Sequence, residues 1–288
     1  MKVDFHVHST ASDGTVDPSD LSFMGSGFTA MAITDHDNCD GVADFLQAGG
    51  ATGTMRFAGV EISIEPGAGF DKFHLLAINV DPSNARLKEL LRRILSGRNE
   101  RNRRILANFS AIGIEIPEQE IAAYAHGEVL ARPHFARWLS DHGYADGVSD
   151  AFEHFLMPDS PRCSRCYEDR WHPDQEEAFG AVHAAGGIAI MAHPRYWRSS
   201  WRRTGCDFTA AERELARLSE CGLDGVECIY QANTQEENVN FSMMAERLGL
   251  LKSAGSDFHG ANKPLIPLGM EVSEDFIAPL LERLRCFR

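Results

Sequence analysis

Histidines and carboxylates recur along this chain at the ends of short apolar runs. Six of the twelve histidines lie at or just after the end of such a run, or close to its start, and acidic residues stand beside them: His6, His8, His36, His74, His193 and His259, with Asp4, Asp13, Asp35, Glu61 and Asp257. Imidazole and carboxylate together suit Zn, Mn or Fe, whereas structural zinc sites usually show paired thiolate motifs. The pattern therefore predicts a site for catalytic divalent cations.

The local spacings fit metal ligands. His6 and His8 are two residues apart in a strand-like run, so their imidazoles point to the same face, and Asp257 and His259 repeat this spacing. Glu61 closes the run GVE, where a carboxylate could bridge two cations. A single His-x-His is a weak signal, and a lone buried histidine is more often a hydrogen-bonded core residue. The prediction rests on the occurrence of these residues at several strand ends together.

The elements that must position these residues follow a β-then-α rhythm. The predicted strands are 2–7, 29–34, 56–62, 73–79, 187–192, 224–230 and 250–255. Helical patterns lie between most of them, at 18–26, 39–49, 174–185, 209–221, 234–248 and 274–285. This rhythm predicts a parallel sheet with helices outside, and seven strands favour a complete or distorted barrel. Active sites of such barrels form at the C-terminal rim of the strands.

The segment 82–170 breaks this rhythm. Its patterns are helical throughout, at 84–111, 117–125, 132–142 and 148–156. We therefore expect a barrel formed by residues 1–81 and 171–288, with residues 82–170 as an inserted helical subdomain over the active site.

Composition narrows the function. The 288 residues carry a formal charge of −14, which argues against stable binding of long nucleic acid. We expect no membrane span and no signal peptide, and the seven scattered cysteines suit reduced thiols in a cytoplasm. The chain has no Gly-rich phosphate loop followed by Lys-Ser/Thr, so ATP-driven chemistry is not indicated.

Several motifs resemble those of the PHP family (polymerase and histidinol phosphatase): MKVDFHVHSTASDGT, AITDHDNCDG, GVEIS, FHLLAI, ARPHFARWL, AIMAHPRY and SAGSDFHG. The resemblance implies a TIM-like, distorted barrel of seven β/α units and a trinuclear site. It implies one metal held by His6, His8, Glu61 and Asp257, a second by Glu61, His74 and His193, and a third by Asp13, His36 and His259. Asp13 stands where many family members have His.

The SDGT form and Arg132-Pro133-His134 are similar to a subgroup of single-domain phosphoesterases. Its members remove a phosphate from nucleoside 3′,5′-bisphosphates, and some trim short RNA from its 5′ end. The resemblance thus implies a hydrolase of phosphate monoesters whose partner is a small nucleotide or a short RNA end. The alternatives are a histidinol-phosphate phosphatase, a cyclic phosphodiesterase, or a non-catalytic PHP module.

The expected mechanism uses two or three divalent cations (Mn, Zn or Fe). Metal-bound water has a pKa near about 7, and a hydroxide bridging two cations can attack phosphorus. Glu61 and Asp257 would support this step as metal ligands. Arg132 and Arg195 are candidates for clamping phosphate, and His134 for binding it or protonating the leaving oxygen. The alternative for Arg132 is a helix cap.

Acidic and aromatic residues near the predicted ligands have two interpretations each. We expect Asp4 and Asp35 to orient the ligand histidines, although Asp35 precedes His36 directly and its carboxylate could point away. Glu227 and Tyr230 end a predicted strand and either line the pocket or, for Glu227, accept a structural hydrogen bond.

Three further motifs each have two interpretations. The arginines of 92–104 are either a solvated helix face or a basic rim for a polyanionic substrate. The stretch 197–203 either packs two indoles on the barrel or stacks a base and holds a second phosphate. Cys163 and Cys166 are better interpreted as two unrelated loop cysteines than as a metal site.

Overall fold

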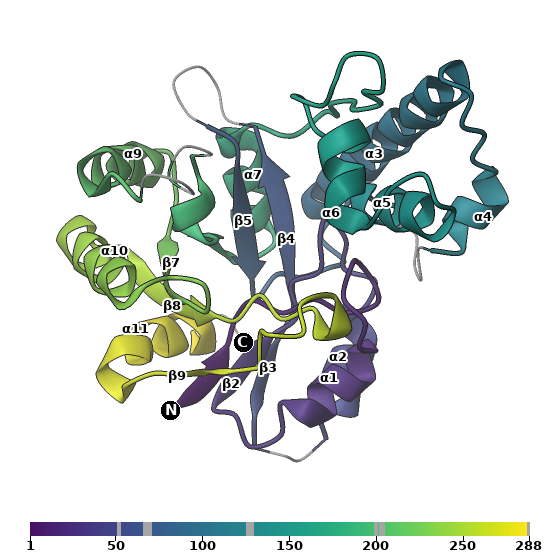
Figure 1. Cartoon of the computed structure of the whole chain (residues 1–288). Coiled ribbons are helices and arrows are strands. Elements are labelled where there is room, and N and C mark those ends of the chain that lie inside the picture. The colour runs from purple at the N-terminus through teal and green to yellow at the C-terminus, as the bar shows by residue number, and fades with distance from the viewer. Residues whose placement is uncertain (51–52, 66–70, 125–129, 199–200, 202–204, 287–288) are drawn as a thin grey trace. The chain divides into compact units, whose positions relative to one another are not determined.

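The computed structural model describes residues 1–50, 53–65, 71–124, 130–198, 201 and 205–286 (Figure 1). These residues form two compact units. Residues Met1–Leu91 and Pro173–Arg288 make up the first, here called the strand unit, and Arg92–His172 make up the second, the helical unit. Within the described ranges, none of the helices combines the length and the apolar character that a membrane span requires.

The strand unit holds two sheets. One has the order β3-β2-β1-β9 and the other the order β4-β5-β6-β7-β8. Their bounds are β1 (Lys2–Asp4), β2 (Ala30–Ala32), β3 (Met55–Phe57), β4 (Gly59–Ile64), β5 (Phe73–Ile78), β6 (Ile188–Met191), β7 (Gly225–Tyr230), β8 (Leu251–Gly255) and β9 (Met270–Glu271). The architecture is mixed α/β.

Two strand predictions were wrong in detail. The predicted strand 56–62 is two strands, β3 and β4, which lie in different sheets and are separated at Ala58. The sheet is also not wholly parallel, because β5 pairs antiparallel with both β4 and β6, as the short β9 does with β1. Only eight residues separate Ile64 from Phe73, whereas a parallel neighbour needs a crossover of about a dozen.

The reversal of β5 helps to build the site. Because β5 runs against β4, its first residues lie beside the last residues of β4, and His74 pairs with Ser63. The backbone oxygen of His74 also accepts a hydrogen bond from Ala192 N, directly after β6. His74 therefore reaches the rim where the neighbouring strands end, although it stands at the start of its own strand.

Helices cover the sheets of the strand unit. Their bounds are α1 (Pro18–Met24), α2 (Val42–Ala48), α7 (Gln175–Ala184), α9 (Phe208–Glu220), α10 (Gln235–Leu248) and α11 (Glu274–Arg285), with short 3-10 turns η2 (Pro194–Tyr196) and η3 (Gly260–Asn262). Asp17, Asp174, Asp207 and Thr234 cap four of these helices with side-chain oxygens. Helix α10 packs on β7 and β8, α11 on β8, and α7 on β6 and β4 (Figure 1).

Alternation along β1 separates core from site. Val3 and Phe5 are fully buried in the main apolar cluster of the strand unit, which includes residues of β2, β5, β6 and α11. Because side chains alternate along an extended strand, Asp4, His6 and His8 point to the opposite face. The same short run therefore anchors the core and presents two imidazoles side by side.

The helical unit contains α4 (Glu118–Ala122), α5 (Arg132–Asp141), α6 (Val148–Ala151), the π-helical turn η1 (Phe152–Leu156) and most of α3 (Ala85–Ala111). It has its own apolar core, centred on Phe109, Phe135 and Trp138. The arginines of α3 do not share one solvated face. Arg103 is exposed, whereas Arg98 and Arg101 are 7% and 4% exposed.

Candidate metal centre

The nine predicted metal ligands converge in the strand unit. Their side chains come from β4, from β5, and from the segments that follow β1, β2, β6 and β8. Every one of them belongs to at least one of four groups whose donor atoms lie within 4.8 Å of one another: His8, Asp13, His36 and His259; His6, His8 and Asp257; His6, Glu61 and His193; His36, Glu61 and His74. Residues up to 253 positions apart in sequence thus share one site.

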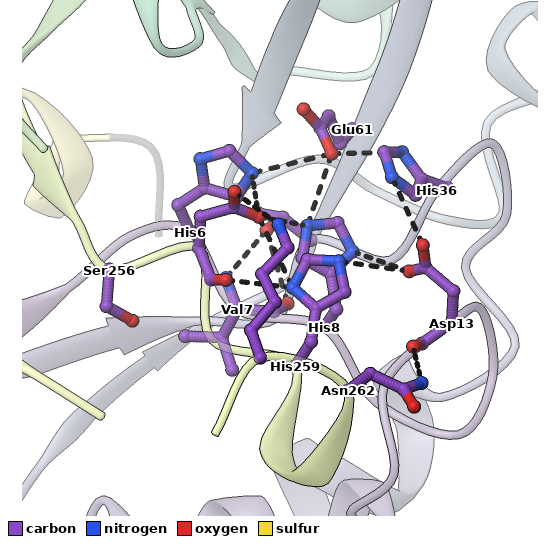
Figure 2. A network of polar contacts seen from close by, with 12 residues as sticks. His6, Val7, His8, Asp13, His36, Glu61, Ser256, His259 and Asn262 are labelled. Carbon is purple, nitrogen blue, oxygen red and sulfur yellow. Dashed lines mark hydrogen bonds and ion pairs between the residues drawn. The ribbon is translucent and has the colours of Figure 1, made fainter. Parts of the chain in front are cut away.

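Glu61 lies at the middle of this centre. Its Oε2 is 3.4 Å from His6 Nε2, 3.2 Å from His8 Nε2 and 2.9 Å from His36 Nδ1, as Figure 2 shows. Its other oxygen, Oε1, is 2.8 Å from His74 Nδ1 and 3.1 Å from His193 Nε2. A carboxylate with different imidazoles on its two oxygens has the geometry of a bridging ligand.

Asp13 gathers a second set of imidazoles. Its carboxylate is 3.2 Å from His259 Nε2, 3.8 Å from His36 Nε2 and 3.7 Å from His8 Nδ1 (Figure 2). Its backbone oxygen accepts a hydrogen bond from the side chain of Asn262. The Asp13 carboxylate therefore lies among three imidazoles.

Asp257 closes the third side of the centre. One carboxylate oxygen is 3.6 Å from His6 Nε2 and 3.4 Å from His8 Nε2. The other accepts hydrogen bonds from Tyr230 Oη at 2.9 Å and Lys263 Nζ at 2.7 Å. Asp257 has φ +60°, and His193 likewise has φ +28°. Non-glycine residues held at positive φ are uncommon and cluster at functional sites.

Three buried atoms identify what the centre is suited to bind. His6 Nε2, His8 Nε2 and Glu61 Oε2 are buried and form no hydrogen bond with any described residue. Leaving buried polar atoms without such bonds is costly, so they point to a ligand at this position. Imidazole nitrogens and carboxylate oxygens are donors for divalent transition-metal ions. The residues therefore fit the predicted cations.

The charges of the centre compensate one another. Burial alone would lower the pKa of His8, but the nearby carboxylates of Asp257 and Glu61 raise this pKa to about 9. Burial alone would raise the pKa of Glu61, but His36 and His6 hold it well below its usual range. Protons and divalent cations compete for the same imidazole lone pairs. The surroundings that favour a positive charge at His8 therefore also favour a bound cation.

Glu227 contacts the imidazole of His6 and the backbone of His193. Its carboxylate is fully buried, lies 3.0 Å from His6 Nδ1 and accepts a hydrogen bond from His193 N at 2.6 Å. A carboxylate on one ring nitrogen turns the other nitrogen toward a metal. In the same way, His259 Nδ1 is 2.8 Å from the backbone oxygen of Asp257. The interpretation of Glu227 as a hydrogen-bond acceptor is confirmed.

Asp4 and Asp35, expected to orient the ligand histidines, contact the backbone and hydroxyl groups around them. Asp4 accepts hydrogen bonds from the backbone N–H of the ligand residue His6, from Ser256 and from Gly269 N. Asp35 accepts hydrogen bonds from Ser9 and from Ser12 Oγ. Asp35 therefore braces the loop after β1, and Asp4 joins the segments after β1 and β8.

Lys263 was missed by the sequence analysis. It follows Asp257 by six residues, in a segment without a helical or strand period, and no spacing rule connects the two. Its contact with the Asp257 carboxylate depends on the turn η3 that returns the chain to the site. Only the local turn geometry could have revealed it.

Arg132 and His134 belong to the helical unit. Arg132 begins α5, its Nη1 donates to Leu156 O at 3.3 Å, and its guanidinium lies 5.2 Å from the centroid of the Tyr167 ring. His134 is buried, and its Nδ1 accepts a hydrogen bond from Ala131 N at the start of the helix. The helix is therefore capped by His134, not by Arg132. Their roles toward a substrate stay predictions.

Arg195 lies next to His193 in the turn η2 of the strand unit. Its guanidinium donates to the backbone oxygen of Ala232 and lies 3.4 Å from the Glu237 carboxylate. Its Nε is buried and forms no hydrogen bond with a described residue. The side chain is therefore anchored at one end, and its predicted phosphate contact stays a prediction.

The two indoles of 197–203 pack into the protein. Trp197 and Trp201 are 4% and 6% exposed, their ring centroids are 6.4 Å apart, and Trp197 lies against Phe73. The packing interpretation is thus confirmed for both rings, while residues 199–200 and 202–204 lie outside the described residues. Cys163 and Cys166 are free thiols, exposed and buried respectively, and belong to none of the four donor groups.

Comparison with known proteins agrees with this geometry. The PHP domain family matches residues 4–129. A 3′,5′-nucleoside bisphosphate phosphatase from Chromobacterium violaceum is 30% identical over 89% of this chain and 87% of its own length. A 5′-3′ exoribonuclease from Haemophilus influenzae is 31% identical over 96% of this chain and 99% of its own length. The chain belongs to the PHP domain family.

Solved structures show the same fold. An amidohydrolase from Chromobacterium violaceum, with bound sulfate and no metal, has a TM-score of 0.83 and 28% identity, covering 100% of this chain and 97% of its own. A protein of Bifidobacterium adolescentis assigned as a metal-dependent phosphoesterase has a TM-score of 0.79 and 28% identity, covering 98% of this chain and 96% of its own. Each aligns over both units of the chain.

Proposed function

We propose that the protein is a metal-dependent phosphoesterase that hydrolyses a phosphate monoester of a nucleotide, either a nucleoside 3′,5′-bisphosphate or the end of a short 5′-phosphorylated RNA. The observation that carries this proposal is the set of buried, unbonded donor atoms His6 Nε2, His8 Nε2 and Glu61 Oε2 at the meeting point of nine ligand-type side chains. The relatives that cover 89% and 96% of the chain, a bisphosphate phosphatase and an exoribonuclease, support the substrate class.

The proposed metal ligands are the nine residues named above. We propose two or three divalent ions, of Mn, Zn or Fe, with Glu61 as the ligand shared between them because its two oxygens contact different imidazoles. When bound, these ions supply Lewis-acid stabilisation of the phosphoryl group and an activated water at neutral pH. Glu61 and Asp257 would take part in the reaction as carboxylate ligands of the metal ions. Tyr230 and Lys263 hold the Asp257 carboxylate in place.

Positive and proton-donating side chains complete the proposed machinery. Arg195 has the phosphate-binding role in the strand unit, because its free Nε leaves a donor for an anion beside His193. Arg132 and His134 have the corresponding roles in the helical unit. His134, whose Nδ1 accepts the hydrogen bond that caps the helix, has the role of binding phosphate or protonating the leaving oxygen.

We further propose that the strand unit is a distorted barrel and the helical unit an insertion into it that takes part in substrate recognition. Hydrogen bonds that join the two sheets to each other support closure of the barrel. Phe5 N donates to Ala254 O between β1 and β8, and Glu61 N donates to Asp35 O between β4 and the segment after β2. A barrel of this kind places the ends of its strands on one rim.

A substrate screen tests the proposal. The protein is loaded with Mn, Zn or Fe and offered a nucleoside 3′,5′-bisphosphate, a short 5′-phosphorylated RNA, histidinol phosphate and a cyclic phosphodiester, and phosphate release is measured. We expect release from the first or second compound. Release from histidinol phosphate or cleavage of the cyclic diester alone would favour the corresponding family activity. No hydrolysis of any ester would contradict the proposal and favour a non-catalytic PHP module.

A further inference from the structure

Lys263 places an ammonium group beside the candidate metal centre of the strand unit. Its Nζ donates to Asp257 Oδ2 at 2.7 Å, and this is the one hydrogen bond that Nζ forms with a described residue. The Lys263 side chain is 40% exposed, whereas that of Asp257 is 9% exposed. Because an ammonium group has three N–H donors, the side not turned to Asp257 is available to a ligand that reaches the centre from solvent.

The two oxygens of Asp257 have different partners. Oδ1 is 3.6 Å from His6 Nε2 and 3.4 Å from His8 Nε2, on the side of the proposed metal ligands. Oδ2 accepts hydrogen bonds from Tyr230 Oη and from Lys263 Nζ. A cation held by Oδ1 with the two imidazoles would therefore not have to displace Lys263. The uncharged hydroxyl of Tyr230 already supports Oδ2, so holding the carboxylate does not by itself require a positive charge.

The turn η3, which precedes Lys263, is fixed to the segment of another proposed ligand. Asn262 Nδ2 donates to the backbone oxygen of Asp13 at 2.7 Å (Figure 2). Gly260 starts the turn with φ +62°, and a Cβ atom there would overlap Thr15 Oγ1, so the close approach of the two segments requires glycine. The backbone of Lys263 is thereby held beside the centre before any ligand binds, which reduces the entropy lost on binding.

The charge of Asp257 cannot neutralise two cations. One carboxylate carries a single negative charge, and with a divalent cation on Oδ1 and the ammonium group of Lys263 on Oδ2 it would face an excess of positive charge. The chain as a whole has a formal charge of −14, which repels an anionic substrate at long range. A local excess of positive charge at the centre would offset this repulsion where the substrate must bind.

We propose that Lys263 is a substrate-binding residue whose ammonium group contacts an oxygen of the phosphate that the centre hydrolyses. This inference rests on the proposed function and adds to it a residue that the sequence motifs did not indicate. Lysine binds phosphate as a compact positive charge, and the hydrogen bond to Asp257 keeps that charge at the centre. Because the contact is made in the bound substrate as well as in the transition state, its loss acts on KM more than on kcat.

Direct binding tests the contact without turnover. The full-length, Mn-loaded protein is titrated with inorganic phosphate by calorimetry. Lys263→Met should weaken phosphate binding about tenfold, as loss of a charge-assisted hydrogen bond does, and Lys263→Gln should act in the same direction. Lys263→Arg keeps the positive charge and should restore most of the affinity. Lys88→Met removes an equal charge from the exposed side of α3, outside the centre, and should bind phosphate as the wild type does.

Tyr230→Phe separates a phosphate contact from mere support of Asp257. It removes the other hydrogen bond to Oδ2 without changing the charge. We expect Lys263→Met to lose clearly more phosphate affinity than Tyr230→Phe, while its affinity for Mn, measured by competition with a chelator, changes by less than about threefold. Equal losses of phosphate affinity in the two variants, a fall in Mn affinity as large as that in phosphate affinity, or phosphate binding as tight as in Lys88→Met would overturn the inference.

Kinetics then separate this inference from the proposed function. With metal-loaded enzyme and the best substrate of the screen, Lys263→Met should raise KM about tenfold and change kcat little, and Lys263→Arg should restore most of the wild-type KM. An active enzyme whose KM does not respond to Lys263→Met overturns the inference alone. An enzyme that hydrolyses no ester overturns the proposed function, while the calorimetric titration with phosphate still decides whether Lys263 contacts the anion.

Discussion

The candidate metal centre and Arg101 of the helical unit bury charge in opposite ways. In the metal centre, carboxylates and imidazoles alternate, and each group lies near one of opposite sign, as Glu61 does near His8 and His36. Arg101 is buried, and its Nε and Nη2 form no hydrogen bond with any described residue.

This difference determines how each region can balance its buried charge. The metal centre can balance its own charge with protons, so a cation enters by exchange and its binding depends on pH. Arg101 cannot balance its charge by losing a proton, because a guanidinium group stays protonated. Four experiments would break or sharpen this contrast.

The largest expected effect follows from removing metals or their ligands. Treatment with EDTA, His8→Ala or Asp257→Ala should each lower phosphate release by a factor of about 1,000 or more, because the activated water and the electrostatic stabilisation are lost together. Far-UV circular dichroism should show a folded protein in each case. His183→Ala, which alters a partly exposed histidine paired with Asp224 outside the centre, should keep activity. Full turnover by either ligand variant would count against the centre.

A smaller effect is expected from replacing Glu227, which hydrogen-bonds to two of the proposed ligand residues. Glu227→Gln keeps the shape of the side chain but removes the charge that orients the His6 ring and holds the backbone N–H of His193. The affinity for Mn or Zn should fall by a factor of about 10 to 100, measured by competition with a chelator. Excess metal should restore much of the activity, which it would not do for a lost catalytic group. Glu212→Gln, in a surface pair with Arg247, should leave metal affinity unchanged.

Arg195→Ala is expected to act mainly on substrate binding. Loss of a charge-assisted contact with phosphate should raise KM about tenfold and change kcat little. Steady-state kinetics on the best substrate of the screen would measure this. Arg247→Ala provides a comparison, because that arginine pairs with Glu212 on the surface. An unchanged KM would remove Arg195 from the phosphate-binding residues and leave it a support for Ala232 and Glu237.

The smallest expected effect is on stability and has the opposite sign. In phosphate-free buffer, Arg101→Met should increase the free energy of unfolding by about 1 kcal/mol, because an apolar side chain replaces a buried, uncompensated charge. Denaturant unfolding would measure the difference. A clear loss of stability in phosphate-free buffer would show that the protein itself already compensates Arg101, and the contrast with the metal centre would disappear.

Local pattern was sufficient for much of the architecture. Apolar runs and their caps predicted α7, α9, α10 and α11 to within two residues at each end, since amphipathic periodicity and capping are local properties. The direction of β5 was not predicted, because it depends on the loop between β4 and β5 being too short for a crossover. The split of 56–62 depends on Ala58, whose type carries no turn signal.

By itself the sequence determined which residues gather at the candidate centre, because side-chain alternation and strand ends place His6, His8, Glu61 and Asp257 on one rim whatever the exact pairing. Tertiary structure alone decided which atoms meet. It assigned Glu227 rather than Asp4 or Asp35 to the histidine rings, and it buried Arg98 and Arg101 while leaving Arg103 exposed. Contacts between residues distant in sequence depend on how elements pack, and residue type and spacing do not encode that packing locally.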